Sequence, residues 1–389
     1  MKKLFSVALA LLVFGLQAGC EGFDVYFTTE TPLVTLIIQS GESALEVDHA
    51  LGDDEEKTLF DILLEHFDVD YDLFDFGDGE MPMLTRIECL DTPYGSFISI
   101  DINGEFAMKG IAELPYEAGD VVTFSRAWWD PLAESVYEGI EAFKAHSHAE
   151  TYLYAENGAH MEVALALRLS GDLDAYVATH GVNPYDRTPE TMSEYVRAVF
   201  THEVFGIDAG AFAEALEGEA EFGWPYMNAL MMLALAAGGI DNKTLKDGFI
   251  ADLQARDLSH IDLDTLSLVL LALSLDEGPV IEGLIDDILD VVTDELYHSS
   301  FGNNAATFAH VIIALIAVGE DPRDARYAEG ETSLVSMFLE YMQEDGSFLW
   351  RLDDEEADLM FSTPQGFLAL VCLHTYFNSA QPINPYRFD

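Results

Sequence analysis

The spacing of apolar residues changes once along the chain, near residue 130. Before that point, short runs of apolar and β-branched residues predict strands at 33–39, 83–90, 95–102 and 120–126. Apolar residues at positions 59, 62, 63 and 67 instead predict one short amphipathic helix, which begins at Thr58. The dipeptide Asn103-Gly104 predicts a hairpin, because type I′ turns need positive φ at both central residues. Residues 21–130 therefore predict a small β-rich domain.

From residue 131 to residue 389 the period is helical. The pattern predicts twelve helices, at 132–146, 150–170, 172–180, 189–204, 208–217, 224–238, 243–255, 263–275, 279–297, 304–318, 331–343 and 361–377. Several of the more apolar ones share an Ala-Leu pair, as at Ala234-Leu235 and Ala314-Leu315, which indicates a repeated helix pair. Six such pairs can close into a ring, with an open solenoid as the alternative. We therefore expect an α+β multidomain protein in which an (α/α)6 toroid follows the β domain.

The first twenty residues predict an export signal. Lys2 and Lys3 precede an apolar run over 4–16, which is too short to span a membrane comfortably, and small residues lead into Cys20. This segment resembles the lipobox of bacterial lipoproteins, although Gln17 stands where a leucine is usual. The resemblance implies cleavage before Cys20, acylation of its thiol and an extracytoplasmic protein anchored to the membrane by lipid. An ordinary secreted protein is the alternative.

The net charge limits which partners the protein can bind, and the cysteine content indicates whether it contains disulfides. Seventeen lysines and arginines face 71 aspartates and glutamates, for a net charge of −54. Such a field repels nucleic acid and anionic lipid. Because the acids are spread along the chain, we interpret them as a solvated surface rather than as a cation site. The two cysteines that follow the signal, Cys89 and Cys372, lie in apolar-rich segments, and we expect both to be buried free thiols.

Two stretches carry a family resemblance. Residues 94–104, followed by Gly110-Ile111 and 117–120, resemble the small β domain at the C-terminal end of transcobalamin and intrinsic factor. The helical half, through 304–322, 343–348 and 363–370, resembles the α/α toroid of those carriers, of terpenoid cyclases and of protein prenyltransferases. The order of the two domains is the reverse of that in the vertebrate carriers. The resemblance implies a β-grasp-like domain before an (α/α)6 toroid, and it does not transfer the ligand.

The catalytic marks of these toroid enzymes are not found in the sequence. Asp262 and Asp264 supply two acids of the D-x-D-D run of polyene cyclases, and the start of a helix favours capping for them. Cys372 and His374 lie two apart on a helix and project to different sides, which argues against a zinc site. The acidic stretch 68–80 departs from the EF-hand template and predicts a solvated strand or loop. We predict no catalytic residue, no metal ligand and no cofactor, other than a corrinoid considered as a ligand.

A binding function remains. The resemblance implies that the N-terminal ends of the inner helices converge on one mouth of the toroid, where a ligand lies, partly covered by the β domain. The residues at those ends are Trp224, Tyr226, Asn228, Asp262, Asp264, Thr265, Asn303, Asn304, Thr307, Thr363 and Gln365. We expect them to bind a small molecule, with a corrinoid or another small nutrient as candidates, although each one alone is equally explained by helix capping. The alternatives are a surface adhesion protein that binds glycan or protein, and an atypical carbohydrate-active enzyme. The enzyme would draw its catalytic groups from His298, Asn303, Asn304, His310 and Tyr226.

Overall fold

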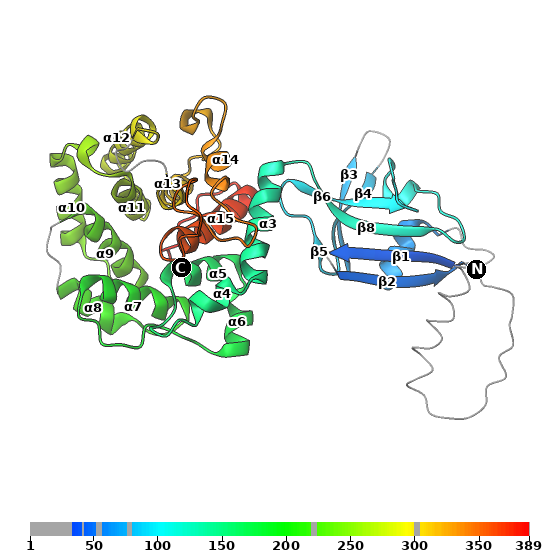
Figure 1. Ribbon diagram of the computed structural model, residues 1–389, viewed down its shortest axis with the longest axis horizontal. Coiled ribbons are helices and arrows are strands. Elements are labelled where there is room, and N and C mark those ends of the chain that lie inside the picture. The colour runs from blue at the N-terminus through cyan, green and yellow to red at the C-terminus, as the bar shows by residue number, and fades with distance from the viewer. Residues whose placement is uncertain are drawn as a thin grey trace. The chain divides into compact units, whose positions relative to one another are not determined.

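The computed structural model describes residues 33–40, 43–51, 57–75, 80–218, 224–298 and 304–388. The predicted signal segment, Cys20 and Asn303 lie outside these residues. The chain divides into two compact units (Figure 1). The β unit comprises residues up to Asp91 together with Ile98–Arg126, and the helical unit comprises Thr92–Phe97 together with Ala127–Asp389. The protein is therefore an α+β protein, with a β-sheet region followed by an all-α region.

The β unit contains two sheets and one α-helix in its described part. The larger sheet has the order β2-β1-β8-β6-β7 and the smaller the order β3-β4-β5. The strands are β1 (Leu33–Ser40), β2 (Ser43–Ala50), β3 (Val69–Asp75), β4 (Glu80–Ile87), β5 (Leu90–Asp91), β6 (Ser96–Ile102), β7 (Glu105–Phe106) and β8 (Val121–Trp128). Strand β1 runs antiparallel to β2 and parallel to β8.

The helix of this unit, α2 (Leu59–His66), confirms the predicted helix and its start. Thr58 accepts a hydrogen bond from the Asp61 amide, and the Asp61 carboxylate accepts one from the Thr58 amide, which makes a capping box. Leu59, Ile62 and Leu63 are buried in the same core as alternate residues of β1. The hairpin prediction is also confirmed, since Asn103 and Gly104 have φ values of 57° and 81° between β6 and β7.

Two features of the β unit depart from the sequence prediction. Cys89 is exposed rather than buried, because it lies in the turn between β4 and β5, beyond the buried end of the strand. Strand β2 is an unpredicted element, and its burial pattern shows why: most of its side chains are exposed, so no apolar alternation marks it. Part of the acidic stretch 68–80 forms strand β3, in agreement with the predicted strand or loop, and Asp68 and Asp70 both pair with Arg86. Residues 76–79 of the stretch lie outside the described residues.

The described part of the helical unit contains thirteen α-helices. They are α3 (Pro131–Ala145), α4 (His148–Leu153), α5 (Met161–Ser170), α6 (Leu173–His180), α7 (Met192–Val204), α8 (Gly210–Gly218), α9 (Pro225–Ala237), α10 (Lys243–Ala255), α11 (Leu263–Leu273), α12 (Pro279–Glu295), α13 (Ala305–Val318), α14 (Leu334–Leu339) and α15 (Ser362–Ser379). The single helix predicted at 150–170 is wrong, because a loop separates α4 from α5. The helix predicted at 331–343 is shorter than expected. None of the helices described is long and apolar enough to cross a membrane.

Six of these helices pack in a closed circuit. Helix α5 contacts α7, α7 contacts α9, and the series continues through α11 and α13 to α15, which packs back against α5. Long stretches of α5, α9, α11, α13 and α15 are buried, whereas α10 and α12 bury one face only. The core of the unit therefore lies among the helices of the circuit.

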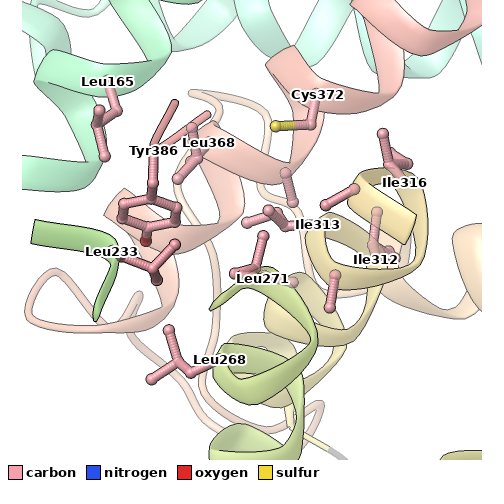
Figure 2. Packing of buried hydrophobic residues seen from close by; sticks show 14 of the residues in the cluster. Leu165, Leu233, Leu268, Leu271, Ile312, Ile313, Ile316, Leu368, Cys372 and Tyr386 are labelled. Carbon is pink, nitrogen blue, oxygen red and sulfur yellow. The ribbon is translucent and has the colours of Figure 1, made fainter. Parts of the chain in front are cut away.

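The C-terminal segment crosses one end of this circuit. The Asn384 amide donates to the carbonyl of Leu271 at the end of α11, at 2.9 Å. Arg168, near the end of α5, donates to the carbonyl of Arg387. Figure 2 shows the Tyr386 ring among Leu165, Leu233 and Leu368, which come from α5, α9 and α15. The amide of Ile383 also donates to the carbonyl of Ile316 near the end of α13, so the last turns of α5, α11 and α13 lie together at this end of the circuit.

Candidate functional site

The first turns of the circuit helices hold most of the predicted site residues. Asp262 accepts hydrogen bonds from the amide and the hydroxyl of Thr265, at 2.9 and 2.8 Å, and so caps α11. Asn304 caps α13 by accepting from the Thr307 amide at 2.9 Å. Thr363 accepts from the Phe348 amide at 3.0 Å. The bonds of Asp262 and Asn304 with Thr265 and Thr307 are helix caps, which is the capping alternative that their position allowed. Thr363 instead ties the start of α15 to the segment at Phe348.

Three other predicted residues carry polar atoms with no partner. Asn228 Nδ2, Asp264 Oδ1 and Gln365 Oε1 are buried and make no hydrogen bond. An unsatisfied buried polar atom costs about 1–3 kcal/mol, so each is an unusual feature of an apolar core. Before α9, Trp224 is 61 % exposed and stacks on Tyr226, with 5.4 Å between ring centroids.

Asp264 lies beside a histidine of another helix. Its Oδ1 is 3.5 Å from Nδ1 of the buried His310, on α13. Burial acts to raise the pKa of Asp264, but the nearby His310 and Thr307 outweigh it and lower that pKa below its ordinary value. His310 Nδ1 is nevertheless aligned with no acceptor. Asp264 and His310 are therefore close enough to interact electrostatically, but no aligned hydrogen bond joins them.

A second histidine and carboxylate pair stands at the start of α5. His160 Nδ1 lies 2.9 Å from Glu162 Oε2, again without hydrogen-bond alignment of the ring nitrogen. Burial opposes ionisation of Glu162, yet the charge of His160 prevails and lowers the Glu162 pKa, with a further contribution from His310. Since α15 lies between α5 and α13 in the circuit, this last interaction reaches across its interior.

Tyr226 joins these two pairs. Burial, followed by the charges of Glu162, Asp264 and Asp262, raises the pKa of Tyr226 to about 12. Its hydroxyl is therefore protonated at neutral pH and able to donate. Glu162, Tyr226, Asp264 and His310 thus come from four helices and influence one another at the same end of the circuit. We call these four residues, with His160, Asn228 and Gln365, the polar end.

The loop that carries His160 is held by side chains around it. Arg197 on α7 donates to the carbonyl oxygens of Gly158 and Ala159, at 2.6 and 2.9 Å. The ring of Tyr152 meets that of His160 edge-on at 5.5 Å, and its hydroxyl donates to the carbonyl of Leu359, at 2.6 Å. These contacts fix the position of the imidazole before any ligand arrives.

The polar end offers hydrogen-bond donors, acceptors and acid–base groups. Among the residues that the structure describes, no trio of His, Cys, Asp or Glu at this end is close enough to hold an ion. Cys372 is fully buried, and burial raises the pKa of its thiol far above the ordinary value. A surface hollow of about 400 Å³ lies elsewhere, between α9, α10 and α11, and includes none of these residues. The partnerless polar atoms, and not that hollow, mark the site.

Sequence reasoning missed His160 and Glu162. The reason is the wrong helix at 150–170, which placed both residues in the interior of a helix rather than at the start of α5. The usable signal was a histidine and a glutamate directly before the Ala-rich run Val163–Leu167. His310 was considered only among residues for an enzyme, because nothing in the sequence pairs it with Asp264.

The comparisons with known proteins identify one part of the chain. Residues 56–126 match the family described as a domain of unknown function, DUF4430. The match lies on the small β domain, and the largely helical region follows it. No curated protein matches the chain.

Proposed function

We propose that this is a ligand-binding protein held outside the cytoplasm by a lipid on Cys20, and that its helical unit is an (α/α)6 toroid of the transcobalamin type. The closed circuit of α5, α7, α9, α11, α13 and α15 supports the toroid. So does the C-terminal segment, which bonds to the last turns of α5, α11 and α13. The ligand binds at the polar end.

One observation carries the binding proposal. Buried polar atoms without an aligned hydrogen bond come from the first half of four helices and from the loop before α5. Asn228 Nδ2 and Gln365 Oε1 face no polar partner in the described residues, whereas His160, Asp264 and His310 take part only in the two unaligned ion pairs. A folded protein rarely leaves several such atoms unsatisfied in one region. A ligand that hydrogen-bonds to them offsets their desolvation on binding.

The composition of the polar end defines the ligand class. Glu162, Asp264 and the Gln365 carbonyl accept hydrogen bonds, whereas Asn228 Nδ2 and Tyr226 donate. Two carboxylates disfavour an anionic ligand, so the ligand is neutral or cationic and carries several hydroxyl, amide or amine groups. Trp224 adds an exposed ring face against which a flat or sugar ring packs. A corrinoid, with its many amides, is the first candidate.

Titration of the purified protein with cobalamin, by calorimetry and by the visible corrin band, tests this proposal. We expect saturable binding that Asn228→Leu weakens, because the variant removes a buried donor and keeps the side-chain shape. Gln343→Met is the matched control, since Gln343 lies outside the polar end and donates to the Tyr341 carbonyl at 3.4 Å. If cobalamin does not bind, the corrinoid is excluded, and the same titration with amino sugars and oligosaccharides tests the ligand class.

The lipid anchor is tested separately. We expect the wild type to incorporate labelled palmitate and to sediment with membranes, and Cys20→Ala to do neither. Cys89→Ala, which removes an exposed thiol elsewhere, controls for nonspecific labelling. Labelling of Cys20→Ala at the wild-type level contradicts the anchor.

The two histidine and carboxylate pairs favour one second function, acid–base catalysis on a glycan. Glu162 with His160 and Asp264 with His310 could supply a base and an acid. In that case Glu162→Gln abolishes turnover of a polysaccharide and leaves its binding in place. A binding protein shows no turnover in either form.

A further inference from the structure

Three side chains in the β unit converge in a way that the ligand site does not use. His49 lies on β2, and Glu65 and His66 lie in the last turn of α2. His49 Nδ1 and His66 Nε2 are 2.9 Å apart. One ligand atom from each of the three residues lies within 4.8 Å of the others. His49 is buried, while Glu65 and His66 are exposed, so the cluster is accessible from one side.

The distances suit a transition metal. Two nitrogens bound tetrahedrally to zinc at about 2.0–2.1 Å lie roughly 3.3 Å from each other. The observed separation is shorter by a few tenths of an ångström, a shift that a rotation of the exposed His66 ring provides. The two rings are inclined at 80°, which keeps them from clashing around a shared ion. Without a metal, one imidazole donates its single N–H to the other.

We propose that His49 Nδ1, His66 Nε2 and the Glu65 carboxylate bind a divalent transition metal, with Zn²⁺ as the best fit and water completing four-coordination. Two imidazoles and a carboxylate form a donor set that zinc accepts and that Ca²⁺ and Mg²⁺ do not favour. This site is independent of the function proposed for the helical unit.

Both elements hold their ligands firmly. His49 is fixed by the pairing of β2 with β1, where it stands opposite Val34. His66 ends a helix whose start is fixed by the Thr58 capping box. A metal at this point therefore links α2 to the edge of the larger sheet, and it stabilises the β unit by binding only the folded form.

One contact competes with the metal. Lys57 Nζ lies 2.8 Å from Glu65 Oε1 and 3.1 Å from Oε2, so an ammonium group occupies the carboxylate that the ion needs. The metal must displace this ion pair, which lowers its affinity. Removal of the Lys57 charge therefore strengthens binding, the opposite of what removal of a ligand does.

The test is a titration of the purified protein with Zn²⁺ against a chromophoric chelator, in a large excess of Mg²⁺ that occupies sites made only of carboxylates. We expect one equivalent of tightly bound zinc. Loss of an outer-shell partner alone weakens metal sites by about 10–100-fold, so we expect His66→Gln to weaken binding by about 100-fold or more. We expect Lys57→Gln to tighten it. His180→Gln, an exposed histidine of the helical unit, is the matched control and leaves the affinity unchanged.

His66 and Glu65 are exposed, so their variants are expected to fold, and circular dichroism checks this. The proposal is overturned if His66→Gln binds zinc as tightly as the wild type, because the bound ions then belong to the acidic surface. It is also overturned in its three-ligand form if Glu65→Gln and Lys57→Gln both leave the affinity unchanged. A zinc-dependent rise in melting temperature that His66→Gln loses supports it independently.

Discussion

At the scale of single residues, Asp262 and Asp264 show what a sequence pattern can and cannot resolve. Both were predicted at the start of one helix, and both lie there. Asp262 caps α11, whereas Asp264 faces His310 of a neighbouring helix. Capping follows from local backbone geometry, which a sequence predicts well. The partner of a residue two positions later depends on which helix packs beside it, and no local pattern contains that information.

The buried Oε1 of Gln365, which has no hydrogen-bond partner, leads to a prediction about the unfolding free energy of the helical unit. Gln365→Met keeps the side-chain length and removes the buried unsatisfied Oε1, so we expect the helical unit to gain about 1 kcal/mol. Chemical denaturation followed by circular dichroism measures this as a higher midpoint at an unchanged slope. Gln343→Met removes a donor that has a partner, and we expect no gain from it. An equal loss in both variants means that Gln365 has a partner in solution.

The lowered pKa of Asp345 leads to a prediction about how the stability of the fold depends on pH. Burial acts to raise its pKa, but hydrogen bonds from Ser347 and the nearby His148 lower the pKa of Asp345 to about 2. Since the folded value lies below the ordinary 3.8, the ionised carboxylate stabilises the fold above about pH 4, and this contribution is lost as pH falls towards 2. The side chain is 41 % exposed, so solvent screening leaves about 1 kcal/mol of the effect.

We therefore expect Asp345→Asn to be less stable than the wild type at pH 7 and as stable at about pH 2. Urea denaturation of both proteins across this range provides the measurement. Asp353→Asn, at an exposed position of the following loop, is expected to match the wild type throughout. A deficit for Asp345→Asn that persists at the lowest pH argues for a packing role instead.

At the scale of elements, predictions held where the determinants are local. The helix at Thr58 and the hairpin at Asn103-Gly104 each depend on neighbours within a few residues. The helix at 150–170 failed because Gly158, with φ of 86°, breaks it where the backbone meets Pro184. A Cβ at Gly158 comes within 2.6 Å of the Pro184 carbonyl oxygen. That contact joins segments that are far apart in the sequence. A prediction based on local apolar periodicity could not include it, and therefore extended the helix through Gly158.

At this scale, the turn at Gly346 leads to a prediction about the melting temperature of a glycine-to-alanine variant. Gly346 has φ of 79°, and a Cβ there comes within 2.5 Å of the Phe143 amide nitrogen on α3. Gly346→Ala combines a left-handed backbone penalty of about 1 kcal/mol with about 1–3 kcal/mol of overpacking. Gly330→Ala is the control, since Gly330 also has positive φ but no atom lies within 4 Å of its added Cβ. We expect melting temperature to fall more for Gly346→Ala, and equal losses contradict the close approach.

At the scale of the whole molecule, the sequence predicted a β-rich part followed by a helical part, and this order is confirmed. It did not predict which helices close the circuit. The repeated Ala-Leu pairs mark apolar helices that become buried, as at Leu235 and Leu315. Helix α15 packs against α5 only if the rotation between successive helix pairs has the right value. Side-chain packing over the whole unit sets that rotation.

The C-terminal segment leads to a prediction about the stability of the helical unit, because it contacts the ends of α5, α11 and α13. Tyr386 is 2 % exposed and packs edge-on against Phe200 at 5.2 Å, among leucines of α5, α9 and α15 (Figure 2). Tyr386→Ala leaves a large cavity among these helices, and we expect a loss of about 3–5 kcal/mol in the unfolding free energy of the helical unit. Phe388→Ala is the matched control: Phe388 is only partly buried beneath Arg168, so its loss is smaller.

Thermal and urea denaturation measure both variants, and amide hydrogen exchange locates the effect. If the segment holds the circuit closed, Tyr386→Ala speeds exchange in the last turns of α5, α11 and α13 alike, because the tail contacts all three. Faster exchange in one helix alone, or equal losses for Tyr386→Ala and Phe388→Ala, contradicts this role.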